Sequence, residues 1–287
     1  MRIADQWKDY EIIDTSKGEK LERWGDVLLI RPDPQIIWNT PKTHPAWKKA
    51  DARYIRSNAG GGRWQNRTLD QKEWKIRYGG LTFKVSPTGF KHTGLFPEQA
   101  VNWDWFSDKI RSAKRPVKVL NLFAYTGGAT LAAAAAGASV THVDASKGMV
   151  TWAKENAASS GLSDAPIRWI VDDCVKFVER EIRRGNHYDA IIMDPPSYGR
   201  GPKGEIWKIE DSVFPLIKLC AQLLTDKPLF FLVNSYTTGL QPAVLRYMIA
   251  TALEKYDGTV TADEIGLPVS SNGLVLPCGA SGRFEGK

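Results

Sequence analysis

Val117 to Gly128 read V-K-V-L-N-L-F-A-Y-T-G-G, an apolar run that breaks into small residues and two glycines. The alanine-rich segment 129–137 follows at once. A strand, a glycine turn and a helix in this order are typical of the first unit of a nucleotide-binding α/β fold, because a glycine turn lets the backbone approach a ligand closely. The stretch therefore predicts an α/β fold with a ligand at the loop.

After this stretch, apolar strand-like runs alternate with helix-like runs. Such alternation predicts a doubly wound parallel sheet. We expect strands near 117–123, 140–144, 167–171, 188–194 and 228–234, helices near 129–136, 147–160, 174–185, 211–224 and 241–255, and a closing hairpin over 259–285. The five strands and the hairpin together predict a Rossmann-like sheet of seven strands.

The part before Val117 is predicted to be rich in β-structure. Short extended runs such as 26–31 are bounded by glycine, proline and aspartate, and 74–85 suits a hairpin. The stretch 53–67 holds four arginines and three consecutive glycines, which predicts a mobile basic loop, and a helix is expected near 97–114. We therefore expect a small, β-rich, basic substrate-binding domain over 1–112 and an α/β domain over 113–287.

The positive charge of the chain is concentrated in its first part. Residues 1–115 carry 22 Lys and Arg against 14 Asp and Glu, whereas the remaining 172 residues carry 17 against 18. The same first part holds eight of the eleven tryptophans. Basic residues interleaved with aromatic ones suit a phosphate backbone and unstacked bases, so an RNA-binding surface is favoured. The alternative is a solvated basic face with structural tryptophans.

Several protein classes are disfavoured by composition. No apolar run approaches the length of a transmembrane helix, and the first residues lack the apolar core of a signal peptide. The three cysteines show no CxxC spacing and the four histidines no metal-ligand spacing. We expect a cytoplasmic protein that binds no membrane and no metal. The sequence leaves its oligomeric state open.

The glycine loop is the first candidate binding element. Its backbone would wrap the amino-acid part of a nucleoside cofactor, and the first N–H groups of the next helix would receive a carboxylate. The loop differs from G-x-G-x-x-G, so a dinucleotide is a less natural ligand. The alternative is a turn that needs glycine only for packing. The loop residues are Phe123, Ala124, Tyr125, Thr126, Gly127 and Gly128.

Carboxylates follow the next two predicted strands. Asp144 lies seventeen residues after Gly127, close to the spacing at which an acid meets ribose hydroxyls, although an acid at this place can also cap a helix. Asp173 can accept a hydrogen bond from the exocyclic amine of adenine, with Asp172 as the capping or solvent-facing alternative.

The sequence D-P-P-S-Y at residues 194–198 is the candidate reaction site. A base amine is a poor nucleophile because its lone pair is delocalised into the ring. The carboxylate of Asp194 and the carbonyls of Pro195 and Pro196 can accept its hydrogens, and Tyr198 can stack on a flipped-out base. The alternative is a rigid loop in which the prolines only end a strand. The loop, the acid and D-P-P together indicate an S-adenosylmethionine-dependent methyltransferase.

These motifs resemble the class I methyltransferases of the bacterial 23S ribosomal RNA group, the RlmI- and RlmK-like enzymes, over nearly the whole chain. The resemblance makes N-L-F-A-Y-T-G-G the cofactor loop, V-D-A-S the ribose site, D-D-C the adenine site and D-P-P-S-Y the reaction motif. It also implies that the segment 91–99 borders the cofactor. It adds these residues to the cofactor contacts: Phe96, Gln99, Ala145, Ser146, Cys174 and Asp194.

One departure from the family bears on mechanism. Relatives that methylate carbon 5 of cytosine place a nucleophilic cysteine just after the fifth core strand, but residues 229–236 here contain none. Transfer to a nitrogen needs no nucleophile, and Asn234 could orient the acceptor. We therefore expect methylation of a base nitrogen, on a purine, with ribosomal RNA as substrate. The alternatives are a protein or small-molecule acceptor, and a non-catalytic RNA-binding protein that retains the cofactor.

Overall fold

The chain forms two compact units in this computed structural model, which describes residues 1–57, 61–66, 69, 73–89, 91–200, 206–237 and 239–287. The β-rich unit comprises Ile3–Val101 and Gly266–Cys278. The α/β unit comprises Met1–Arg2, Asn102–Ile265 and Gly279–Lys287. Neither unit is contiguous in sequence. The functional division into domains 1–112 and 113–287 stays a prediction.

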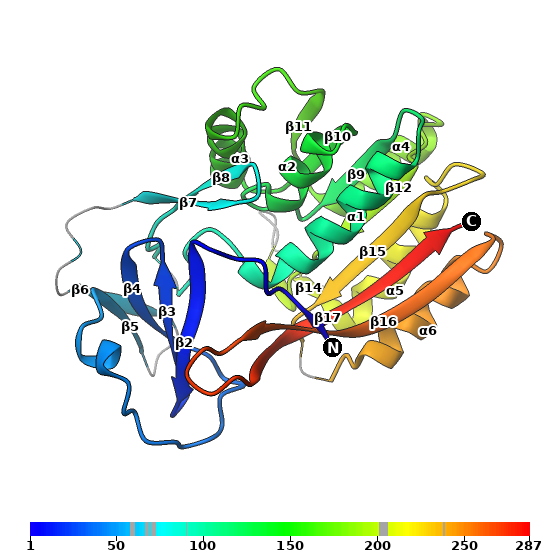
Figure 1. The fold of residues 1–287 in the computed structure, drawn as a ribbon. Helices are drawn as coiled ribbons and strands as arrows, with labels where there is room; N and C mark the ends of the chain where they lie inside the picture. Colours follow the sequence, from blue (N-terminus) through cyan, green and yellow to red (C-terminus); the bar gives the residue numbers. More distant parts are fainter. Residues whose placement is uncertain (58–60, 67–68, 70–72, 90, 201–205, 238) are drawn as a thin grey trace. The chain divides into compact units, whose positions relative to one another are not determined.

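The α/β unit is built on one mixed sheet, in the order β1-β16-β17-β15-β12-β9-β10-β11 (Figure 1). The predicted seven-stranded Rossmann-like sheet is confirmed, and a short strand at its edge makes an eighth. β15 pairs in parallel with β12 and antiparallel with β17. The strands are β1 (Arg2–Ile3), β9 (Lys118–Leu122), β10 (Ser139–Asp144), β11 (Ile167–Val171), β12 (Ala190–Met193), β15 (Phe230–Ser235), β16 (Gly258–Pro268) and β17 (Val275–Gly286).

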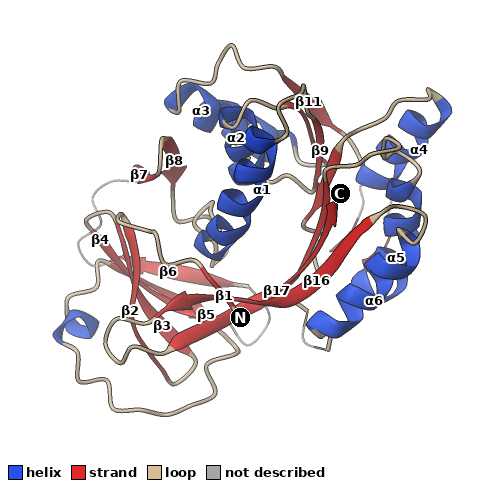
Figure 2. Ribbon diagram, turned by 45° about the vertical axis from the view of Figure 1, so that its right-hand side comes forward, coloured by secondary structure: helices blue, strands red, loops and turns tan. Residues whose placement is uncertain are grey.

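Helices cover both faces of this sheet (Figures 1 and 2). One face carries α1 (Ala100–Ser112), α2 (Gly128–Ala135) and α3 (Lys147–Ser159), and the other carries α4 (Cys174–Arg183), α5 (Ile209–Ala221) and α6 (Pro242–Ala252). Strands buried on both faces need continuous apolar sequence, and β12 and β15 are buried at every position.

The register of the parallel strands decides where the loops gather. Leu122 pairs with both Val143 and Met193, and Met193 also pairs with Val233. These residues stand at the carboxyl ends of their strands or within two residues of them. The segments that follow therefore meet at one edge of the sheet, where open α/β sheets bind ligands.

The β-rich unit contains a five-stranded sheet in the order β2-β3-β4-β5-β6 and a separate two-stranded sheet, β7-β8. The turn region 266–278 belongs here because Ile12 bridges Val269 and accepts the N–H of Ser270. Two 3-10 turns complete the unit, η1 (Pro45–Lys48) and η2 (Pro97–Gln99). Its strands are β2 (Tyr10–Ser16), β3 (Glu19–Trp24), β4 (Val27–Pro32), β5 (Ala52–Arg56), β6 (Gly62–Asn66), β7 (Trp74–Tyr78) and β8 (Leu81–Val85). In the α/β unit, the antiparallel pair β13 (Tyr198–Arg200) and β14 (Ile206–Lys208) follows β12.

The prediction of a mobile basic loop over 53–67 is wrong for its described residues. β5 and β6 form an antiparallel hairpin in which Tyr54 pairs with Trp64. Their rings meet edge to face with centroids 5.5 Å apart. Glycine and arginine composition indicated a loop, but this aromatic cross-strand pair favours a strand. Residues 58–60 and 67 of the predicted loop lie outside the described residues.

A buried ion pair joins two strands of the β-rich unit. Glu22 on β3 is fully buried and accepts two hydrogen bonds from the guanidinium of Arg31 on β4, at 2.6 and 2.7 Å. Tyr10 donates a third, at 2.7 Å. Burial alone would raise the pKa of Glu22, but Arg31 and Lys20 outweigh it and hold that pKa at about 2. The carboxylate therefore stays ionised inside the unit.

We expect Glu22→Gln to lower the free energy of unfolding by about 3–5 kcal/mol, because Arg31 then keeps a buried charge without its partner. The pKa of Glu22 is about 2 in the folded chain against an ordinary 4.5, so the ionised pair stabilises the fold above pH 4.5. That stability is lost as the pH falls from 4.5 toward 2. Urea unfolding followed by tryptophan fluorescence measures both effects.

Glu11→Gln is the matched control, because Glu11 pairs with Arg23 at a partly exposed position. This change should cost less than about 1 kcal/mol. Equal losses for the two variants would contradict the role assigned to the buried pair.

Candidate functional site

The predicted cofactor loop holds an unusual backbone conformation. Phe123, Tyr125 and Gly127 all have positive φ, at 55°, 51° and 89°. Such values cost free energy at residues with a side chain, so the surroundings must impose them. Two hydrogen bonds do so: Ala124 N–H donates to the Val143 carbonyl at 3.1 Å, and the buried Asn156 amide donates to the Thr126 carbonyl at 2.9 Å.

Both glycines of the loop are needed for packing. A Cβ at Gly127 would lie 3.0 Å from the Cβ of Ala153, and one at Gly128 would lie 2.6 Å from the indole of Trp103. The packing explanation thus accounts for glycine at both positions. It leaves the ligand role of the backbone open, because Gly127 is the N-cap of α2 and has no side chain to cover the first-turn N–H groups.

Asp144 fixes this loop to the next strand. One carboxylate oxygen accepts the N–H of Tyr125 at 2.9 Å, and the other accepts the N–H of Ser146 at 2.8 Å. Burial raises the pKa of Asp144, while both hydrogen bonds lower it. The N-cap of α3 is Ser146, whose hydroxyl accepts the N–H of Met149. Asp144 is therefore not the N-cap of this helix, and the capping alternative is wrong. Ala145 and Ser146 are exposed beside it.

Of the two acids after β11, Asp173 and not Asp172 caps the following helix. Asp173 is the N-cap of α4 and accepts the N–H of Lys176 at 2.9 Å, whereas Asp172 pairs with Arg180. The capping role assigned to Asp172 as an alternative is therefore wrong. Capping uses one oxygen of Asp173 and leaves its other oxygen to accept an adenine amine, so that contact stays a prediction.

The side chain of Cys174 supports the backbone of the cofactor loop. Its side chain is buried, its sulfur accepts the N–H of Phe123 at 3.3 Å, and its thiol donates to the Val143 carbonyl at 3.8 Å. The sulfur thus links the start of α4 to the residues at the ends of β9 and β10. Its predicted contact with the cofactor is untested.

The D-P-P-S-Y segment follows β12 directly and lies next to the glycine loop. Asp194 N–H donates to the Leu122 carbonyl at 3.4 Å. Trp207 on β14 ties the two segments together, since its indole N–H donates to the Pro196 carbonyl at 2.7 Å and its ring lies 5.3 Å from that of Phe123. Pro195 is buried, and Tyr198 is half exposed.

Asn234 follows Val233, the residue of β15 that pairs with Met193, and is almost fully buried. Its carboxamide oxygen accepts a hydrogen bond from Asn102 at 3.1 Å. The oxygen of Asn102 accepts in turn from the guanidinium of Arg283 at 3.0 Å, which fixes the orientation of the Asn102 amide. The predicted contact of Asn234 with the acceptor is untested, and its oxygen already has this partner.

Phe96 and Gln99 belong to the β-rich unit, around η2. Gln99 is buried, and the ring of Phe96 lies 5.3 Å from that of His92. Their predicted contact with the cofactor stays a prediction.

The residues at the sheet edge fit S-adenosylmethionine in the chemistry of their donors and acceptors. The uncapped first turn of α2 suits its carboxylate. Asp144 keeps lone pairs for ribose hydroxyls after accepting two N–H groups. The free oxygen of Asp173 suits the adenine amine.

Three residues that support this edge were missed from sequence: Asn102, Asn156 and Trp207. Each acts through a partner more than ten positions away in the chain. Periodicity does not report such contacts. A buried asparagine on an apolar helix face was the available signal for Asn156.

The fold and the residues at the carboxyl edge of the parallel strands together define a methyltransferase. The sequence profile of the family described as S-adenosylmethionine-dependent methyltransferase matches residues 39–240, and the chain belongs to that family. A solved S-adenosylmethionine-dependent methyltransferase from Agrobacterium tumefaciens is 38% identical, with a TM-score of 0.94 over 99% of this chain and 93% of that one.

Curated relatives are named "Ribosomal RNA large subunit methyltransferase K/L". The protein from Shewanella frigidimarina is 36% identical over 72% of this chain. That from Pseudoalteromonas atlantica is 33% identical over 75% of this chain. The chain spans 28% and 32% of the length of these two relatives.

Among the described residues, no helix is long and apolar enough to cross a bilayer. The same residues contain no group of three or more His, Cys, Asp and Glu side chains placed to hold a metal ion.

We expect Asp144→Asn to weaken S-adenosylmethionine binding about 10- to 100-fold, because an amide nitrogen would face one of the two backbone N–H groups that the carboxylate accepts. Isothermal titration calorimetry measures the change. Asp164→Asn, at an exposed position of the same unit, is the control and should bind like the unaltered chain. Similar affinities of the two variants for S-adenosylmethionine would contradict the assignment of Asp144 to the binding site.

Proposed function

We propose that the chain methylates a purine-base nitrogen of large-subunit ribosomal RNA. The observation that carries this proposal is the position of D-P-P-S-Y, hydrogen-bonded to the end of β9 and tied to the cofactor loop through Trp207. The names of the curated relatives favour ribosomal RNA as the substrate. The positive charge of residues 1–115 suits a phosphate backbone.

S-adenosylmethionine supplies a methyl group on a sulfonium centre. The carboxylate of Asp194 accepts a hydrogen of the base amine and keeps the nitrogen lone pair directed at that methyl. The new nitrogen–carbon bond forms as the sulfur–carbon bond breaks, and the proton leaves the nitrogen toward Asp194. The half-exposed ring of Tyr198 offers a stacking face for the base. Proximity and exclusion of water lower the barrier further.

The acceptor carbonyls are not equivalent. The Pro196 carbonyl already accepts the indole N–H of Trp207. We therefore assign the acceptor role at the base to Asp194 and Pro195, with Pro196 and Trp207 holding the loop in shape.

A nitrogen acceptor is favoured over carbon 5 of cytosine because that carbon needs a thiolate nucleophile. All three cysteines are buried free thiols, and burial raises the pKa of Cys174, Cys220 and Cys278. Neutral buried thiols are inert. Free thiols also suit the reducing cytoplasm, where ribosomes are modified, and we place the chain there.

A protein or small-molecule acceptor is the second candidate. It would use the same cofactor edge and would leave RNA unmethylated.

We expect transfer of labelled methyl from S-adenosylmethionine to RNA from cells that lack this protein, and little transfer to RNA from cells that have it. Asp194→Ala should lower the rate at least about 100-fold, because removing a positioned proton acceptor costs this much. Binding of S-adenosylmethionine should stay within about threefold. Digestion to nucleosides identifies the methylated atom.

Asp211→Ala, an acidic residue in the first turn of α5, is the control and should retain the rate. Transfer by Asp194→Ala at the control rate would remove this reaction-site assignment. Absence of label in RNA, with cofactor binding intact, would favour the protein or small-molecule acceptor.

A further inference from the structure

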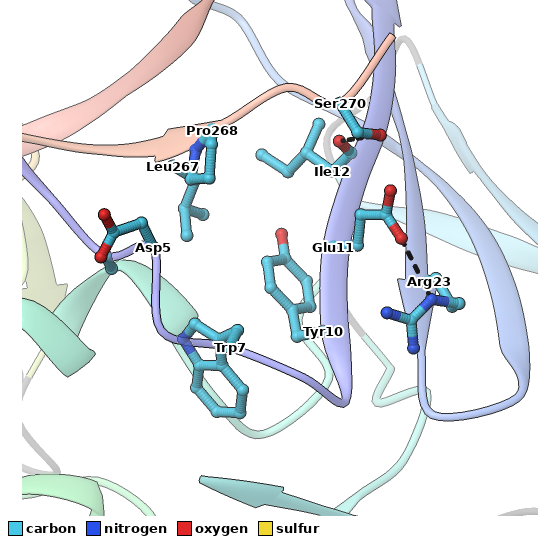
Figure 3. A pocket seen from close by; sticks show the side chains of 10 residues that line it. Asp5, Trp7, Tyr10, Glu11, Ile12, Arg23, Leu267, Pro268 and Ser270 are labelled. Carbon is cyan, nitrogen blue, oxygen red and sulfur yellow. Dashed lines mark hydrogen bonds and ion pairs between the residues drawn. The ribbon is translucent and has the colours of Figure 1, made fainter. Parts of the chain in front are cut away.

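Two hollows of the β-rich unit differ in charge. The cavity in Figure 3 encloses about 150 Å³ and carries two carboxylates, Asp5 and Glu11, against the single guanidinium of Arg23. Arg23 donates to Glu11 at 3.2 Å, so its charge is already compensated. This cavity does not suit an anion.

The second hollow is a groove of about 490 Å³ along β3, β4 and β5. It is lined by the end of β4 at Pro32, the turn residue Lys17, the outer part of β5, and the side chains of Glu19 and Lys42. Register places these segments side by side, since Glu19 pairs with Pro32. Its size suits one or two nucleotides.

Four cations and one acid line this groove: Lys17, Lys42, Arg53 and Arg56 against Glu19. Glu19 accepts from Lys42 at 2.5 Å and from Arg53 at 2.7 Å. Within the described part of the chain, Lys17 and Arg56 have no ion pair. The groove therefore has a net charge of 4 − 1 = +3, and two of its cations have no acidic partner there.

The cations are held on rigid structure. Lys17 sits in the β2–β3 turn at a φ of 52°, and its N–H donates to the Trp38 carbonyl at 2.9 Å. The ammonium of Lys42 lies 4.1 Å from the centre of the Trp47 ring. The side chain of Lys42, held by this contact, loses less freedom when a ligand binds.

Positive charge continues beyond the lining residues. Burial lowers the pKa of Lys91, and the neighbouring charges of Lys20, Arg56 and Arg31 lower it further, against the opposing effect of Asp33. Cations crowded in this way are stabilised by an incoming anion.

The groove also offers an apolar contact between its cations. Ile55 is 39% exposed, lines the groove and lies on the same face of β5 as Arg53, because side chains alternate along a strand. An aliphatic side chain beside exposed guanidinium groups suits a sugar or a base next to a phosphate.

We infer that this groove binds the phosphate backbone of RNA, with Lys17 and Arg56 each contacting a phosphate and Ile55 contacting the adjoining nucleoside. The inference rests on the proposed function and adds a binding surface to it. An acidic protein segment would satisfy the cations equally, but RNA is already the acceptor in the proposed reaction and the substrate named for the curated relatives. RNA is therefore favoured.

The test uses the full chain with Lys17→Gln and Arg56→Gln combined. Binding to a fluorescently labelled single-stranded RNA is measured by anisotropy as salt is raised. Each lost phosphate contact removes about 0.7 from the slope of log affinity against log salt, so the double variant should lose about 1.4. Its affinity should fall at least about tenfold at low salt.

Arg246→Gln combined with Lys227→Gln is the matched control, because both residues are exposed cations of the α/β unit and the same charge is removed. This control should leave the slope unchanged. Equal slopes for the groove variant and the control would overturn the inference. So would absence of RNA binding by the unaltered chain, or displacement of the RNA by polyglutamate at matched charge.

Methyl transfer to RNA is measured on the same proteins. RNA binding that depends on the groove, together with no transfer by the unaltered chain, would support the groove and reject the proposed reaction. Transfer by the unaltered chain, with binding that ignores the groove, would reject the groove alone.

Discussion

The carboxylate of Asp144 is the contact on which the cofactor edge depends. It accepts one N–H from the glycine loop and one from the turn before α3, so a single side chain holds two neighbouring loops in register. Both loops leave parallel strands at the same edge. Tyr125 has a positive φ, and the bond to Asp144 helps to hold it there. An ionised carboxylate can hold both N–H groups and still accept ligand hydroxyls.

A second layer of contacts stabilises that edge. Asn156 reaches the loop from α3, the Cys174 sulfur lies beneath it, and Trp207 links it to the D-P-P segment. These residues bind the loop backbone through its N–H and carbonyl groups or pack against its rings. The shape of the loop is therefore set by side chains on three other elements, and less by its own residues.

Much of the α/β unit could be predicted from sequence because its elements are long and its apolar pattern is regular. The strand near 167–171 and the helix near 147–160 are examples, and both occur within a residue of their expected bounds. Glycine and arginine dominate the stretch 53–67 and favour a loop, whereas the pairing of Tyr54 with Trp64 depends on a partner strand that local composition does not reveal.

The site residues also include some that the local sequence predicts and some that it does not. Asp144 and Asp194 could be proposed from spacing, because each directly ends or follows an apolar strand. The choice between Asp172 and Asp173 as the cap of α4 depends on backbone angles at the turn, which composition does not encode. Asn102 and Trp207 contact residues 132 and 11 positions away, so no local pattern marks them.

The discontinuity of the β-rich unit has a consequence for biosynthesis. Ile12 and Ile13 complete their hydrogen bonding with Ser270 and Ser271, which the ribosome adds about 258 residues later. Part of the hydrogen bonding of strand β2 therefore cannot form until Ser270 and Ser271 have been synthesised. Contacts of such long sequence separation form slowly, so we expect this unit to complete its pairing late in folding.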